Sequence, residues 1–159
     1  MPATYAPIAS TTLTSSGTIT FNSIPQTYTD LVLVTNLIGA GTADIDITLN
    51  GDTGSNYSWT VLYSNGTTIS SSRITNFATM RLDYYGYIGT TFGQMNVANF
   101  LNYNNTSTFK TVIARANNGD YGVDGVVSTW RSTAAITTIA ITNTLSAGST
   151  ASLYGIKAA

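Results

Sequence analysis

Hydrophobic and polar residues alternate along most of this chain with the two-residue period of a β-strand. Ile45, Ile47 and Leu49 are separated by polar residues, as in a strand with one face in a core and one in water. In residues 57–63 the same period places Tyr57, Trp59 and two further apolar side chains on one face. The pattern therefore predicts strands, and no stretch of helical period interrupts it.

One run departs from this alternation. Residues 31–34 read Leu-Val-Leu-Val, with no polar position among them. A short run of this kind, rich in branched residues, is typical of a strand that is covered on both faces. We therefore expect Val32 and Val34 to belong to the most buried strand. Val34→Asp should then destabilise the fold by several kcal/mol, because an unpaired charge is costly to bury.

Turn signals divide the chain into short strands. Asn50-Gly51, with Asp52 to Gly54 after it, predicts a turn that needs positive φ, and the residues of 64–76 are mostly Ser, Asn, Gly and Thr, which predicts a loop. In residues 77–88, Gly86 suggests a bulge or a close approach of backbone. The last two strands look like a closing pair around residues 146–149. The predicted strands are 18–21, 30–38, 43–50, 57–63, 77–88, 92–103, 109–116, 122–131, 136–142 and 151–156, with a looser alternation over 4–13.

These elements predict an all-β fold. Many short strands with regular turn signals favour an antiparallel β-sandwich of the jelly-roll type. A length of 159 residues favours one domain spanning residues 1–159. The chain has no Cys, so the core forms without disulfides.

Composition narrows the possible partners. Charged residues make up 8% of the chain, hydrophobic residues make up 43%, and the formal net charge is -1. The chain is therefore not of a disordered composition, and its six basic residues are too scattered to form the basic face that nucleic acid requires. No apolar run approaches the length of a membrane span, and no signal peptide is visible at the N-terminus. We expect a soluble protein, made in a cytoplasm, that binds neither nucleic acid nor membrane.

The sequence lacks most of the residue types that commonly act in catalysis. The sequence contains no His, no Cys and no Glu, so the commonest general base and the strongest nucleophile are missing. No nucleophile elbow or phosphate-binding glycine loop is present. We expect no catalytic residue, no cofactor and no enzyme, and a hydrolase that uses Asp side chains is only the third functional hypothesis.

Asp44 and Asp46 allow two interpretations. Oxygen-rich turns suit calcium, but Leu49 stands where an EF-hand needs its glycine, and Ser55 where it needs its closing Glu. The first interpretation is that both aspartates simply face water from a strand, and the second is a structural cation. We predict no metal site.

The aromatic residues are the strongest candidates for binding. Tyr84, Tyr85 and Tyr87 lie beside Gly86, and Trp59 and Trp130 are the only tryptophans. On a strand, Tyr84 and Tyr85 would face opposite sides, so one of them would face solvent or a subunit. We predict an interface at the three tyrosines. Core packing is the alternative for all these rings, and stacking on a glycan, with Trp59 and Trp130 as the candidate rings, is a weaker one.

Four segments in order along the chain resemble a family of small bacteriophage virion proteins, found especially in cyanophage and environmental phage genomes. The segments are IPQTYTDLVLV (24–34), LNGDTGSNYS (49–58), WRSTAAI (130–136) and AGSTASLYGIK (147–157). Members of this family look like structural proteins of capsids or tails. The resemblance implies a virion as the setting, and it carries over no functional residue.

These observations together predict a non-enzymatic structural protein of a phage particle, specifically a capsid decoration (cement) protein that binds the major capsid protein. The alternative is a tail or head-fibre module that binds a host surface glycan. A sandwich has edge strands to cover, and the chain has few charges with which to protect them. We therefore expect a homo-oligomer, and the resemblance makes it a homotrimer.

Overall fold

The computed structural model describes residues 4–157, which form twelve strands. The strands are β1 (Tyr5–Thr12), β2 (Gly17–Phe21), β3 (Asp30–Leu37), β4 (Asp46–Leu49), β5 (Tyr57–Ser64), β6 (Ile69–Phe77), β7 (Met80–Arg81), β8 (Gln94–Leu101), β9 (Lys110–Asn118), β10 (Gly122–Trp130), β11 (Ile139–Leu145) and β12 (Thr150–Ile156). No helix occurs among these residues. The all-β prediction is therefore confirmed.

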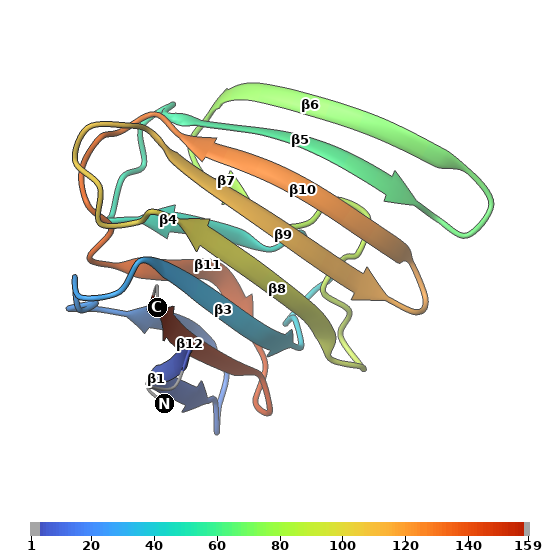
Figure 1. Ribbon diagram of the computed structural model, residues 1–159. Coiled ribbons are helices and arrows are strands. Elements are labelled where there is room, and N and C mark those ends of the chain that lie inside the picture. Colours follow the sequence, from blue (N-terminus) through green and yellow to red (C-terminus); the bar gives the residue numbers. More distant parts are fainter. Residues whose placement is uncertain (1–3, 158–159) are drawn as a thin grey trace.

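The strands form two antiparallel sheets that face each other (Figure 1). The large sheet has eight strands in the order β1-β12-β3-β8-β9-β10-β5-β6, and the small sheet has four in the order β2-β11-β4-β7. The chain crosses repeatedly between the two sheets, a double-sheet arrangement of the kind that jelly rolls represent. The predicted β-sandwich is confirmed, with one sheet twice as wide as the other.

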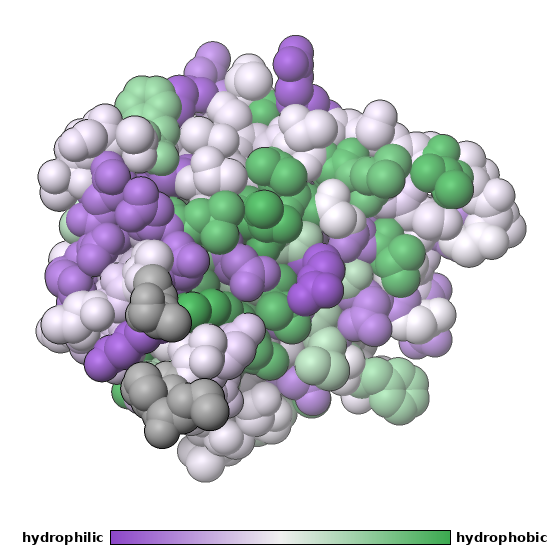
Figure 2. Space-filling model, in the orientation of Figure 1, coloured by the Kyte–Doolittle hydropathy of each residue, from purple (hydrophilic) through white to green (hydrophobic). Residues whose placement is uncertain are grey.

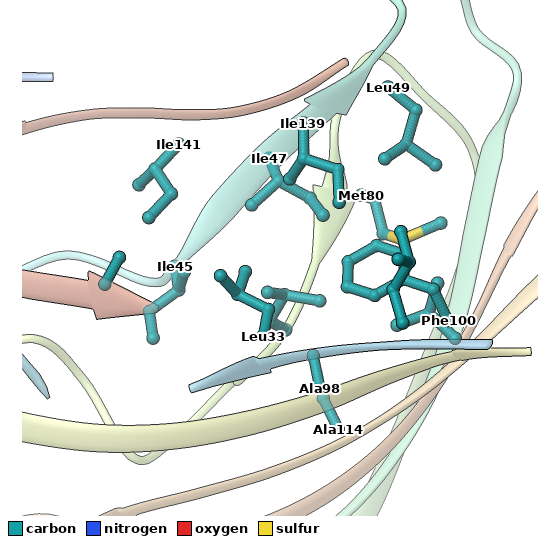
Figure 3. Close-up of a cluster of buried hydrophobic side chains, with 14 of the residues drawn as sticks. Leu33, Ile45, Ile47, Leu49, Met80, Ala98, Phe100, Ala114, Ile139 and Ile141 are labelled. Carbon is teal, nitrogen blue, oxygen red and sulfur yellow. The ribbon is translucent and has the colours of Figure 1, made fainter. Parts of the chain in front are cut away.

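The core lies between the two sheets (Figure 3). Alternate residues of the small sheet, including Ile47 and Ile141, point toward Leu33 and Phe100 of the large sheet, and all four are at most 1% exposed. Sheets that pack face to face interdigitate in this way because each pleated strand sends every second side chain inward. The alternation of Ile45, Ile47 and Leu49 therefore correctly identified the core-facing side of β4.

The apolar run of β3 is buried mainly from one side. Leu31 and Leu33 face the core and are fully buried. Val32 faces outward and is still covered, but Val34 is half-buried and Asn36 is exposed. The prediction that both faces are covered is correct at Val32 and wrong toward the end of the strand. Val34 is thus a poorer probe of the core than Leu33.

Three local predictions are wrong. Residues 69–76, which the sequence predicts as part of a loop, belong to β6, which pairs with β5 with a register shift near Phe77. Residues 82–88, placed in a strand, are irregular after the two-residue β7. The last two strands do not pair, because β11 binds β2 and β4 in the small sheet, and β12 binds β1 and β3 in the large one. The Asn50-Gly51 turn does have positive φ at both residues, 53° and 70°.

Candidate interaction surfaces

The three candidate tyrosines lie in the irregular segment 82–93, between β7 and β8. This segment packs against the inner face of the large sheet, and polar side chains of that sheet hold it by its backbone. Asp124 Oδ2 accepts hydrogen bonds from the N–H groups of Tyr84, Tyr85 and Gly86, at 2.8, 2.8 and 2.6 Å. Three donors on one buried carboxylate oxygen fix the conformation of this segment.

Two amide side chains extend this attachment. Asn96 Nδ2 donates to the Leu82 carbonyl at 2.9 Å, and Asn118 Nδ2 donates to the Tyr87 carbonyl at 2.6 Å. At Gly86 a Cβ atom would lie 3.1 Å from Asp124 Oδ2 and 3.3 Å from the Ala116 Cβ. The close approach predicted at Gly86 is therefore confirmed, and it is an approach to the large sheet.

The tyrosines belong to a continuous row of rings, which we call the aromatic row: Trp59, Tyr84, Tyr63, Tyr85, Tyr87 and Tyr121. Successive ring centroids in this order lie 5.4, 5.0, 5.3, 5.6 and 5.6 Å apart. These separations are those of favourable aromatic pairs. The row begins in the core at Trp59 and ends at Tyr121, which is 38% exposed.

This arrangement changes the argument for an interface at Tyr84, Tyr85 and Tyr87. Tyr84 and Tyr85 do not face opposite sides of a strand, because both rings contact Tyr63. All three tyrosines are half-buried, so each ring packs against a neighbour and keeps a free edge. The reasoning from strand alternation was wrong, and the interface itself stays a prediction.

The two tryptophans are core residues. Trp59 is 4% exposed and Trp130 is 2% exposed. Trp130 stacks on Tyr57 with centroids 6.4 Å apart and donates its indole N–H to Asp52 Oδ2 at 2.7 Å. Neither ring offers a face to a sugar, so the prediction of Trp59 and Trp130 as stacking rings is wrong. Their positions among inward-facing residues of β5 and β10 explain this burial.

Asp44 and Asp46 do not simply face water. Both bind the guanidinium group of Arg81, with N–O distances of 2.5 Å for Asp44 and 3.2 Å for Asp46. Burial raises the pKa of Asp44 to about 6, against the lowering effect of Arg81. Within residues 4–157, no group of three or more carboxylate, imidazole or thiol side chains is placed to hold a metal ion. The two aspartates form a partly buried ion pair with Arg81.

Asp83 is the most enclosed carboxyl group of the described residues, with no exposed surface. Its Oδ1 accepts from the Ile45 N–H at 2.6 Å, and its Oδ2 accepts from Gln94 Nε2 at 2.9 Å. Burial raises its pKa well above the usual value, and the nearby charges of Asp44 and Asp124 act in the same direction. A raised carboxyl pKa is common in active sites, but no substrate can reach a group that is sealed in the core.

The outer face of the large sheet is the broadest candidate surface, and we call the part formed by β5, β8, β9 and β10 the apolar face. Its outward side chains include six exposed hydrophobic residues: Leu62, Met95, Leu101, Ile113, Val123 and Val127. Arg115 is the single charged residue among the outward positions of these four strands, all of which are described. In Figure 2 the hydrophobic side chains gather over the middle of this face. Contiguous exposed apolar patches on soluble proteins mark sites of interaction.

The fold and these surfaces define an all-β sandwich with an apolar face that carries one charged residue, Arg115, and with several enclosed carboxyl groups. No protein-family model matches the chain, and no curated protein matches it. Among solved structures, the chain is similar to a protein of unknown function from Shewanella oneidensis MR-1, with 8% identity, a TM-score of 0.25, and coverage of 98% of this chain and 80% of that one. A likeness at this level carries no argument about function. Among the described residues, no helix is long and apolar enough to cross a membrane.

Proposed function

We propose that this protein is a non-enzymatic structural protein of a phage particle, specifically a capsid decoration (cement) protein. The observation that carries the proposal is the apolar face, whose six exposed hydrophobic side chains stand on four adjacent, fully paired strands. A rigid sheet loses little conformational freedom when it docks, so apolar contacts made by it yield more binding free energy than those of a mobile loop.

The enclosed carboxyl groups support a role without catalysis. Asp83 is sealed in the core, Asp124 binds three backbone N–H groups, and Asp44 is paired with Arg81. Each of these groups is already engaged in a contact within the fold that a substrate would have to break.

The partner that this face fits is the major capsid protein, presenting an uncharged surface of its own. With Arg115 as its one charged group, the face offers few ion pairs, so its contacts are mainly apolar and hydrogen-bonded. Binding to the assembled lattice in preference to loose subunits stabilises the assembled state by mass action. Weak contacts suffice when linked copies bind many equivalent lattice points together.

A homotrimer on the virion completes the proposal. The large sheet ends in β1 and β6, which have no further strand beside them among the described residues. β6 is nine residues long, contains no Pro and carries Arg73 as its single charge. An edge of this kind tends to pair or to be covered, and a symmetric contact between copies covers it. The trimer is made in the host cytoplasm and resides on the virion.

Re-addition to depleted particles tests the docking face. Particles are stripped of the protein, mixed with purified wild type or variant, and separated from free protein by sedimentation. We expect Val127→Arg to lower binding at least tenfold, because it places a second positive charge in the middle of the apolar face. Phe92→Arg, at a more exposed apolar residue in the segment before β8, is the matched control and should bind as wild type. Equal binding of wild type and Val127→Arg would exclude the apolar face as the docking surface.

A further inference from the structure

Three loops meet at one end of the large sheet and enclose hollows that the docking proposal does not use. The loops are the β5–β6 turn, the β9–β10 turn and residues 89–93. A hollow of about 250 Å³ lies between Phe92 and the β9–β10 turn, and one of about 260 Å³ lies between that turn and the β5–β6 turn. A smaller hollow of about 90 Å³ lies between residues 89–92 and Tyr121. Asn118 and Asp120 line all three.

The side chains around these hollows combine exposed rings with free polar groups. Phe92 is 68% exposed and Tyr121 is 38% exposed. The Asp120 carboxylate makes no hydrogen bond or ion pair with any described residue. The Asn65 Oδ1 atom accepts three hydrogen bonds from Thr67 and Thr68, which leaves its Nδ2 group free to donate outward.

The β9–β10 turn that carries these groups is held in place before any ligand arrives. Asn118 Nδ2 donates to the Tyr87 carbonyl at 2.6 Å, and Asn118 Oδ1 accepts from the Asp120 N–H at 3.0 Å. The Tyr121 ring meets Tyr87 edge to face at 5.6 Å, which joins the turn to the aromatic row. A site with fixed geometry loses little entropy on binding.

The chemistry of these groups selects one class of ligand. A ligand with an apolar face suits the Phe92 and Tyr121 rings, and one with hydroxyl groups suits carboxylate and amide partners, since a hydroxyl both donates and accepts. Asp120 is the single charged residue that lines the three hollows, which disfavours anionic ligands. We propose that this end of the sheet is a binding site for neutral saccharides, with one sugar unit on each side of the β9–β10 turn.

This site borders the apolar face, because Met95 and Val123 line two of the hollows, but its exposed rings and free polar groups lie in the loops, and the proposal goes beyond the decoration role. It also differs from the earlier expectation of sugar stacking at Trp59 and Trp130, since it uses neither tryptophan. A virion protein with both surfaces would bind the particle through the sheet and present the loops to a cell surface.

The test is binding to defined saccharides. Biotinylated protein, tetramerised on streptavidin, is applied to an array of neutral oligosaccharides (cellopentaose, maltopentaose, mannopentaose, galactopentaose and chitopentaose) and of sialylated and uronic acid oligosaccharides. We expect binding to at least one neutral member and weaker binding to the acidic ones. Phe92→Ala and Asp120→Ala should each lower the affinity for that member at least tenfold, with unchanged melting temperatures because both side chains are exposed.

Val127→Arg is the matched control, and it should bind the saccharide as wild type does while failing to bind stripped particles. The proposal is overturned if no neutral member binds, if only acidic members bind, or if both loop variants bind as wild type. Because Val127→Arg should change only particle binding, and the loop variants should change only saccharide binding, failure of one proposal leaves the other standing.

Discussion

Single polar residues on inward-facing positions shape this fold as much as the apolar ones do. Asp124 stands in line with Val126 and Trp130 on the inner side of β10, and it is 6% exposed. A buried carboxylate is tolerated only where donors replace the water that it loses, and three backbone N–H groups do so here. Asp83 is fully buried and accepts only two hydrogen bonds, which makes it the costlier of the two charges.

The first prediction concerns the two faces of β3. Leu33→Ala should lower the free energy of unfolding by about 2–5 kcal/mol, the usual cost of a cavity in a packed core. Val34→Ala should cost about 1 kcal/mol, because Val34 is half-buried on the outer side. Urea denaturation of both variants measures the difference. Equal losses would show that the two faces of β3 are buried alike.

The second prediction concerns pH. The folded-state pKa values of Asp44 and Asp83 lie above that of an unfolded Asp, so the folded protein holds more protons than the unfolded chain. Stability is therefore greatest near pH 4, about the pKa of an unfolded Asp, and falls as the pH rises from there through about 6, where Asp44 ionises in the folded protein. Asp52, whose pKa is lowered by hydrogen bonds from Trp130 and Asn56 despite some burial, loses its contribution below about pH 4.

Melting temperatures at pH 5 and pH 8 measure this effect. Wild type should melt higher at pH 5, and Asp83→Asn should reduce the difference, because the amide keeps the shape and one acceptor oxygen without a charge. Asp120→Asn, at an exposed carboxylate, should leave the difference unchanged. A wild-type protein that melts higher at pH 8 would contradict the burial of an unpaired charge at Asp83.

At the scale of elements, the 82–93 segment is where sequence reasoning and the structure diverge most. The alternation of residues 80–84 resembles a strand, but the segment has partners other than strand backbone, namely Asp124, Asn96 and Asn118. These three partners are polar residues, which a sequence reading places on the solvent side of a strand. Their positions within the strands could have corrected this, because the alternation puts Asn96 on the same side of β8 as Phe100, and Asp124 on the same side of β10 as Trp130.

The third prediction follows from this attachment. Asp124→Ala should lower the free energy of unfolding by about 3 kcal/mol, because three backbone donors lose their acceptor. Asp124→Asn keeps one acceptor oxygen and should lose less. Amide hydrogen exchange should show Tyr84, Tyr85 and Gly86 losing protection in Asp124→Ala while β3 keeps its own. Unchanged exchange at these three amides would show that other contacts hold the segment.

At β6 the error is the reverse, because a segment predicted to be a loop forms a strand. Its composition, rich in Ser and Thr, is that of a loop, yet residues 69–74 pair with β5 in regular register. An edge strand with one buried neighbour needs few apolar side chains, so hydropathy gives little signal there. The strands of the centre, such as β3 and β9, carry apolar residues on their inner face and could be predicted to within a few residues.

At the scale of the whole molecule, sequence periodicity predicted the class of fold and could not predict the pairing. Residues 136–142 and 151–156 read as a hairpin because a turn separates them, but the turn connects two sheets. Strand order depends on how the apolar faces of strands far apart in the sequence fit against one another, which local periodicity does not reveal. The apolar face is such a property, since Leu62, Ile113 and Val127 are exposed neighbours only after β5, β9 and β10 pair.

The fourth prediction concerns the assembly. Light scattering at micromolar concentration should give three times the mass of one chain, because the β1 and β6 edges remain to be covered. A monomer at every concentration would remove the argument from edges. It would leave the decoration role intact, since the capsid lattice could cover the edges instead.

The central claim is that the apolar face docks the protein onto the capsid lattice, and the most direct measurement is an electron cryo-microscopy reconstruction of the intact particle. We expect density for this sandwich at many symmetry-related lattice positions, with the outer face of strands β5, β8, β9 and β10 against the major capsid protein and the β9–β10 turn, at the end of that sheet, free in solvent. Density confined to the tail, or a sandwich that docks with this face in solvent, would contradict the account.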